Sequence, residues 1–268
     1  MGARGQICNL WACRNPHPRE ESIALPRTYQ RILSMTPRRL MPLLLPCLLL
    51  VAMSQALASD APLVPTPSER ATAPATPKPF AARYRLEVSG WPSTSIDHRL
   101  FQDGASWFSE MRAAIAVARG QERSRFLVKE DGVRSLQYSS GYSLMGFGGD
   151  YRLAPDDLTS LPDRQAALFE LSRRAVNGSC SERCYLRYQD HRGREEKMLY
   201  RVVGAASLEL PSGPVDAVEV KVTEPDKPER HLLFHFHPEL PGLMLAAEFY
   251  RDGERRSRLS LSELSLEE

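Results

Sequence analysis

Three histidines and a glutamate form the group of residues with the clearest chemical potential. His231, His235 and His237 occupy alternate positions of an apolar segment, and Glu239 follows shortly after. Alternate side chains of a strand share one face, where neutral imidazoles can converge on zinc or copper. The same spacing also arises when histidines simply form the polar face of a strand, and Pro238 interrupts this strand before Glu239. His235 and His237 are therefore metal-ligand candidates, and we assign no metal.

A glycine-rich run at 146–149 is the second group to consider. Phosphate-binding loops follow a strand and open a helix, whereas this run continues into Asp150 and a polar, aromatic segment. The pattern favours a hairpin tip or loop. Because the segment carries Tyr142, Leu144, Met145 and Phe147, we expect either a lip over a cavity or a segment folded back onto the core.

Acidic and hydroxyl side chains are plentiful, but their spacing does not indicate a catalytic centre. Asp156, Asp157 and Asp163 precede a predicted helix, where turn formation and capping explain them. No G-x-S-x-G motif occurs. We predict no catalytic residue and no cofactor.

An export signal governs the interpretation of the whole chain. Within residues 35–58, Arg38 and Arg39 precede an apolar stretch at 40–53, and small residues lead to a cleavage site between Ala58 and Ser59. We expect translation to start at Met35, which makes residues 1–34 a mis-assigned extension, with a functional extension as the alternative. The mature protein is predicted to reside in the periplasm, without a membrane-spanning segment.

Cleavage changes both the charge and the cysteine content. Residues 59–268 contain 28 Lys and Arg against 31 Asp and Glu, so the mature chain is mildly acidic and nucleic acid is not an expected partner. Cys180 and Cys184 are the two remaining cysteines. In an oxidising compartment, two thiols this close across a Gly/Ser turn favour a disulfide. A redox pair is the alternative, although C-x-x-C is its usual spacing.

Composition and periodicity divide the mature chain into a linker and one domain. Residues 59–79 are rich in Pro, Ala and Thr and predict an extended linker, and residues 80–268 form a single β-rich domain. Alternation of apolar and polar residues predicts about ten strands joined by short turns. One helix is predicted over 161–176, with Ser160 and Asp163 as a capping box. The expected fold is a strongly curved antiparallel sheet or partly closed barrel with one covering helix.

Three segments give the chain a family resemblance. The opening strand begins Phe80-Ala81-Ala82-Arg83-Tyr84, a helix follows at mid-chain, and Phe236-His237-Pro238-Glu239-Leu240-Pro241 precedes the last strands. This layout resembles the exported bacterial proteins grouped as domain-of-unknown-function family 3108. The resemblance implies a β-rich periplasmic protein without an established activity.

These observations leave three hypotheses for function. The first is a non-enzymatic envelope module that binds an amphipathic ligand such as a lipid, a glycan or an envelope protein, because curved sheets often enclose ligand sites. The second is a hydrolase or metal-dependent enzyme that acts on envelope glycans or lipids. The third is a structural scaffold without a small ligand.

Overall fold

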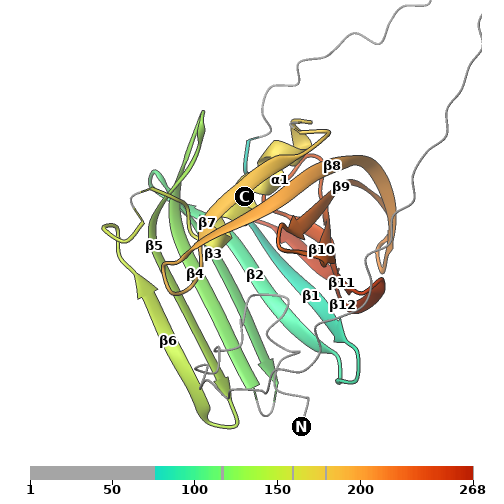
Figure 1. Cartoon of the computed structure of the whole chain (residues 1–268), viewed down its shortest axis with the longest axis horizontal. Helices are drawn as coiled ribbons and strands as arrows, with labels where there is room; N and C mark the ends of the chain where they lie inside the picture. Colours follow the sequence, from blue (N-terminus) through green and yellow to red (C-terminus); the bar gives the residue numbers. More distant parts are fainter. Residues whose placement is uncertain (1–75, 116–117, 159, 179, 268) are drawn as a thin grey trace, which may run out of the picture. The chain divides into compact units, whose positions relative to one another are not determined.

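The computed structural model describes residues 76–115, 118–158, 160–178 and 180–267, and they form twelve strands and one helix (Figure 1). The first six strands are β1 (Phe80–Val88), β2 (Thr94–Asp103), β3 (Ser106–Ile115), β4 (Ala118–Lys129), β5 (Gly132–Leu144) and β6 (Phe147–Leu153). The helix α1 (Arg164–Val176) follows. The last six strands are β7 (Cys184–Gln189), β8 (Glu195–Leu210), β9 (Gly213–Glu224), β10 (Lys227–Phe236), β11 (Met244–Arg251) and β12 (Glu254–Leu266).

All twelve strands belong to one antiparallel sheet. Their order is β6-β5-β4-β3-β2-β1-β12-β11-β10-β9-β8-β7, so every neighbour except the β1–β12 pair is joined by the next turn of the chain. Short connections between successive strands dictate this meander. The mainly β, strongly curved antiparallel sheet predicted from the alternation is confirmed, and the sheet is not closed, because β6 and β7 remain its two edges.

Side chains, not strand pairing, bridge these two edges. The ring of Tyr151 on β6 lies edge-on to His191 in the β7–β8 turn, with 4.5 Å between ring centroids. The neighbouring Arg192 donates to the Tyr151 hydroxyl at 3.5 Å. Near the start of the helix, Gln189 of β7 donates its backbone N–H to the carbonyl of Pro162. The curved sheet therefore has a seam between β6 and β7 that is held by a few polar and aromatic contacts.

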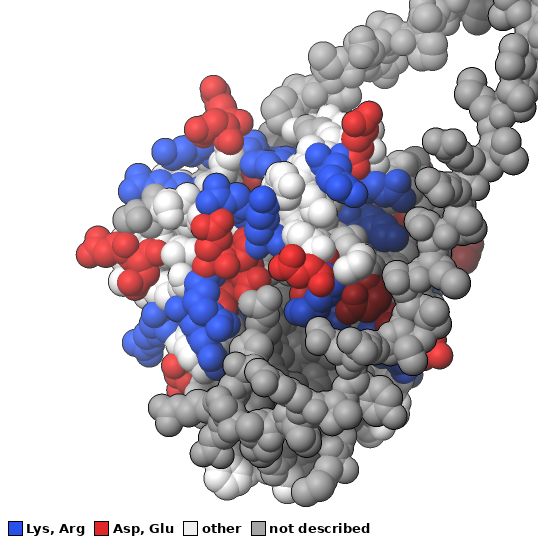
Figure 2. Space-filling view, viewed as in Figure 1, with Lys and Arg blue, Asp and Glu red and all other residues white. Residues whose placement is uncertain are grey.

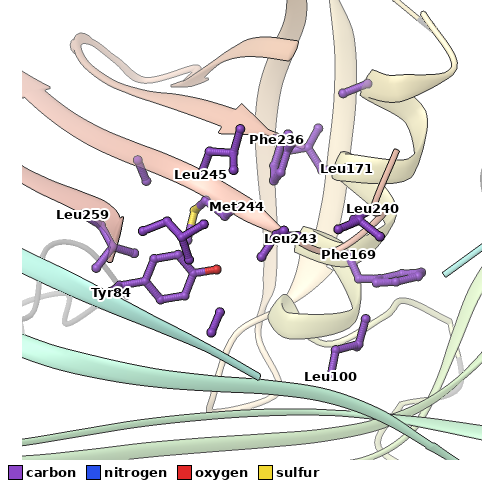
Figure 3. Packing of buried hydrophobic residues seen from close by; sticks show 14 of the residues in the cluster. Tyr84, Leu100, Phe169, Leu171, Phe236, Leu240, Leu243, Met244, Leu245 and Leu259 are labelled. Atoms are coloured by element: carbon purple, nitrogen blue, oxygen red, sulfur yellow. The ribbon is translucent and has the colours of Figure 1, made fainter. Parts of the chain in front are cut away.

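Helix α1 lies inside the curve of the sheet. It contacts β4 and β5 from one half of the sheet and β7, β9 and β10 from the other. Phe169 on the helix meets Phe126 of β4 with ring centroids 5.1 Å apart. Figure 3 shows helix residues meeting apolar side chains of both sheet halves, among them Leu100 of β2 and Phe236 of β10. Burial of this apolar surface is the main stabilising contribution to the fold.

The β10–β11 loop completes the core. Leu240 and Leu243 are both buried, and Gly242 between them donates its backbone N–H to the Ser172 hydroxyl of α1 at 2.6 Å. Gly242 has a φ of 90°, and a Cβ atom there would lie 2.8 Å from Phe169. Glycine is therefore required here both by the backbone conformation and by the close approach of the helix.

The helix begins three residues later than the sequence indicated. Asp163 is itself the N-cap, and its carboxylate accepts the backbone N–H groups of Gln165 and Ala166. The same carboxylate accepts the hydroxyls of Ser124 on β4 at 2.7 Å and Ser135 on β5 at 2.6 Å. The predicted start at Leu161 with a capping box is wrong, because the partners of Asp163 come from the sheet and are invisible in a local motif.

The glycine-rich run at 146–149 includes a hairpin tip, as the sequence favoured, because Met145 and Gly146 form the turn between β5 and β6. The rest of the run belongs to strand β6, which was not expected there, since Gly148 and Gly149 weaken the strand signal. The predicted export signal at 35–58, the extension at 1–34 and the linker up to residue 75 lie outside the described residues.

Replacing Asp163 by alanine should destabilise the protein by about 3 kcal/mol. The change removes the helix cap and leaves two buried serine hydroxyls without their acceptor. Asp163→Asn should lose less, because the amide oxygen still caps the helix. The free energy of unfolding in urea measures both effects.

Asp157→Ala provides the matched control, since the Asp157 carboxylate accepts one exposed backbone N–H, that of Ala154, at 2.8 Å. We expect a loss below about 1 kcal/mol there. Equal losses in Asp163→Ala and Asp157→Ala would contradict the role assigned to Asp163.

Candidate functional site

A buried polar chain between the sheet and α1 contains two titratable groups with strongly shifted pKa values, His98 and Arg164. His98 Nε2 lies 3.0 Å from the Ser109 hydroxyl, which donates to Gln165 Oε1 at 3.1 Å. Gln165 Nε2 donates to Glu122 at 2.6 Å, and Glu122 also forms an ion pair with Arg164. Burial lowers the pKa of His98 to about 4 and that of Arg164 to about 10. This chain ties β2, β3 and β4 to the first turn of the helix.

The polar chain positions the first turn of the helix against the sheet. Perturbed pKa values indicate a functional site when the groups face a cleft. Here His98, Ser109, Glu122 and Gln165 are buried, with their side chains turned toward the helix. Burial also raises the pKa of Asp163 despite its hydrogen bonds from Ser135 and Ser124. These groups bond to one another within the protein interior.

The three histidines do not converge. His231 stacks on Tyr250 with 4.8 Å between centroids, and His235 Nε2 lies 3.2 Å from Glu219 on β9. His237 falls beyond the end of β10, after a bulge, and its Nδ1 accepts the backbone N–H of Glu239. In the part of the chain that the structure describes, no group of three His, Cys, Asp or Glu side chains is placed to hold a metal ion.

The two cysteines are joined in the structure. A disulfide links Cys180, in the connection after α1, to Cys184 at the start of β7. The carbonyl of Cys180 accepts the backbone N–H of Val202 on β8, and its side chain packs against the core. The bridge therefore fixes the turn that carries the chain from the helix to the edge strand.

An apolar strip covers the inner face of β3–β6 at the end away from α1. Even-numbered residues of β4 face the helix, as Ser124 and Phe126 show, so Ala118 and Gly120 lie on the same face farther along the strand. The strand register places two rows across this face. The outer row is Ile115, Ala118, Leu144 and Phe147, and the inner row is Ala113, Gly120 and Tyr142, next to Ile96 of β2, which is buried in the core. We call the seven residues from β3–β6 the inner strip.

Helix α1 is too short to cover the inner strip. A helix of 13 residues is about 20 Å long and about 10 Å wide, whereas a strand of 12 residues such as β4 extends about 40 Å. Figure 1 shows the helix at one end of these strands. Ala113, Ala118 and Gly120 bring little side-chain volume to the centre of the inner strip.

The inner strip ends at the exposed tip of the β5–β6 hairpin. Met145 is 74% exposed and Phe147 is 82% exposed, while Leu144 and Tyr142 beside them are 37% and 45% exposed. The tip therefore does not fold back onto the core. Of the two arrangements that the sequence allowed, the structure shows an exposed apolar lip.

The backbone of the β5–β6 hairpin tip is strained at Met145. Met145 and Gly146 form a two-residue turn with φ values of 51° and 84°, a pattern in which Asn, Asp or Gly normally takes the first position. The β11–β12 turn of the same chain follows that rule with Asp252 and Gly253, at 53° and 78°. A methionine held in the left-handed region costs about 1 kcal/mol, and strain of this kind often marks a functional position.

Positively and negatively charged side chains are intermingled on the surface of the described residues. Figure 2 shows Lys and Arg interspersed with Asp and Glu over the described part of the visible face. Asp156 and Asp157 lie in the loop before the helix, where Asp157 closes a turn. Within the described residues, no helix is long and apolar enough to cross a membrane.

In the part of the chain that the structure describes, the fold is an open antiparallel sheet curved around one helix, with an apolar strip on its inner face that α1 does not reach. No protein-family model matches the chain, and no curated protein gives a significant match. Among solved structures, the chain is similar to MucB in its complex with MucA from Pseudomonas aeruginosa, at 14% identity and a TM-score of 0.36. That match covers 71% of this chain and 52% of MucB.

Two further structures show weaker likeness. A crystal structure of MucB alone matches at 14% identity and a TM-score of 0.33, covering 73% of this chain and 55% of MucB. A putative outer membrane lipoprotein-sorting protein domain from Vibrio parahaemolyticus matches at 10% identity and a TM-score of 0.19, covering 71% of this chain and 86% of that domain. The chain thus spans about half the length of the MucB structures. These likenesses are too weak to indicate what the chain binds.

Buried His98 should make the protein less stable as the pH falls from about 6.5 to about 4. In the unfolded chain the imidazole takes a proton near its usual pKa of about 6.5, whereas in the folded protein it stays neutral down to about 4. The unfolded state therefore binds more protons in this window, and the free energy of unfolding drops by up to about 3 kcal/mol.

The measurement is urea unfolding of the wild type and His98→Gln at a series of pH values. Asp163 contributes with the opposite sign, because its raised pKa lets the folded state take a proton first, and this contribution cancels in the difference between the two proteins. A difference that does not change between pH 7 and pH 4 would show that His98 is not buried in its neutral form.

Proposed function

We propose that this chain is an exported, non-enzymatic binding module of the bacterial envelope that holds the apolar part of an amphipathic ligand on the inner strip. The observation that carries the proposal is Met145, an exposed apolar side chain kept at a turn position where Asp, Asn or Gly would cost less. A strained, exposed apolar side chain of this kind supports a role in contact with another molecule.

The inner strip suits an acyl chain better than a compact polar ligand. Its two rows are apolar across β3–β6, and the glycine and alanines at its centre place little side-chain volume in the path of a bound chain. The hairpin tip with Leu144, Met145 and Phe147 then covers part of the chain. Burial of such surfaces on a ligand is favourable at about 25 cal/mol per Å².

The seam beside β6 supplies the polar surroundings for a headgroup. Tyr142 stacks on Tyr151 with 6.4 Å between centroids, and the guanidinium of Arg192 lies 5.6 Å from the centre of the Tyr151 ring. An amphipathic ligand on the inner strip therefore has apolar contacts along the strands, with aromatic and cationic groups near one edge. Tyrosine and arginine are common at such mixed surfaces.

Removing the apolar tip should weaken binding of a fluorescent long-chain fatty acid by at least about tenfold, with no loss of stability. The double variant Met145→Asn, Phe147→Ser replaces two exposed apolar side chains, and asparagine tolerates the positive φ at position 145. Fluorescence titration measures the affinity, and thermal unfolding measures the stability.

Val203→Ser is the matched control, because Val203 is apolar and 49% exposed but lies on β8, outside the inner strip. It should bind the fatty acid as the wild type does. Wild-type protein that binds neither the fatty acid nor phospholipid vesicles, or a tip variant that binds as tightly as the wild type, would refute the proposal.

A further inference from the structure

The outer face of β3–β6, opposite the inner strip, carries a cleft of about 490 Å³. Its lining includes Phe108, Arg123, Arg125, Gln137, Ser139 and Arg152. Odd-numbered residues of β4 point away from α1, which places Arg123 and Arg125 on the face that the helix does not touch. The cleft is therefore separate from the inner strip, although both are built on the same four strands.

The strand register brings the polar residues of the cleft together from three strands. One row across the sheet contains Arg123 of β4, Ser139 of β5 and Arg152 of β6. The next row contains Arg125 of β4 beside Gln137 of β5. Neighbouring strands lie about 4.8 Å apart, and arginines from both rows line the same cleft.

The aromatic ring of Phe108 orients the side chains of two of the arginines. The guanidinium carbons of Arg123 and Arg125 lie 5.1 and 5.8 Å from the centre of the Phe108 ring. Phe108 in turn stacks on Phe101 with 5.0 Å between centroids. Guanidinium groups held over an aromatic ring keep their edge N–H donors available. Arg125 also donates from Nε to the Ser106 hydroxyl at 3.1 Å, which further fixes its orientation.

The cleft has an excess of positive charge that the described residues leave unneutralised. Arg123 pairs with Glu110 at 3.0 Å. For Arg125 and Arg152, no carboxylate of the described chain lies within ion-pair distance, and Asp150 is the one acidic residue in the lining. Unpaired cations in a concave surface raise the local concentration of anions.

We propose that this cleft binds a phosphate group carried by a ligand of about the size of a phosphorylated sugar. Planar guanidinium forks match phosphate oxygens in a bidentate manner, and two forks from adjacent rows suit a dianion better than a single carboxylate. The Ser139 hydroxyl and the Gln137 amide supply neutral hydrogen bonds for the rest of the ligand. A volume near 490 Å³ lies within the range of small-molecule sites.

Calorimetric titration of the full protein with glucose 6-phosphate, inorganic phosphate and glucose tests the assignment, and sedimentation with phosphatidic acid vesicles tests a lipid source of the same group. We expect binding of at least one phosphate-bearing probe and none of glucose. Binding of the soluble probes indicates a soluble ligand, and binding of the vesicles alone indicates a lipid headgroup. Both results support a phosphate site.

Arg125→Gln and Arg152→Gln should each weaken binding of the recognised probe by about tenfold or more, because each removes a charge-assisted hydrogen-bond donor. The control Arg201→Gln removes an exposed arginine from β8 and should have no effect. Binding of fatty acid should be unchanged in all three variants, which separates this site from the inner strip. Failure of the wild type to bind any phosphate probe, or equal loss in Arg201→Gln, would overturn the proposal.

Discussion

The carboxylate of Asp163 is the interaction on which the rest of the structure depends. It accepts four hydrogen bonds at once, two from the first turn of α1 and two from serine hydroxyls on β4 and β5. An acid buried this deeply is stable only when its lone pairs are used, so helix and sheet must meet in one relative position. The neighbouring chain from His98 to Arg164 repeats the constraint along the next strands. Polar groups thus specify where the helix lies, and apolar burial supplies the stability.

That placement determines which surfaces remain available. Because α1 is held at one end of the long strands, it does not reach the small and apolar side chains at the other end of their inner face. The hairpin tip and the seam between β6 and β7 then border this area. Alternate side chains of the same strands point to the opposite face, where arginines lie over the ring of Phe108. One set of four strands therefore offers an apolar surface on one side and a cationic cleft on the other.

Much of the fold could be predicted from the sequence, and the exceptions have identifiable causes. About ten of the twelve strands were predicted, because one face of each is buried and the period of two is clear. Strand β6 was missed because Gly148 and Gly149 give no strand signal. The helix start was misplaced because Ser124 and Ser135, which complete the cap, lie 39 and 28 residues away from Asp163. The histidines were correctly assigned to alternate positions, except that His237 follows a bulge that no local pattern reveals.

The amino-acid sequence by itself determined the mainly β architecture and the presence of one helix, because the spacing of apolar residues is a local property of the chain. It also identified the glycine-rich tip as a lip or a folded segment, without deciding between them. Only the tertiary structure showed that the tip is exposed, that Met145 occupies a strained turn position, and that Arg125 and Arg152 share a cleft. Those facts depend on strand register and on the position of α1, which are set by contacts between residues far apart in the chain.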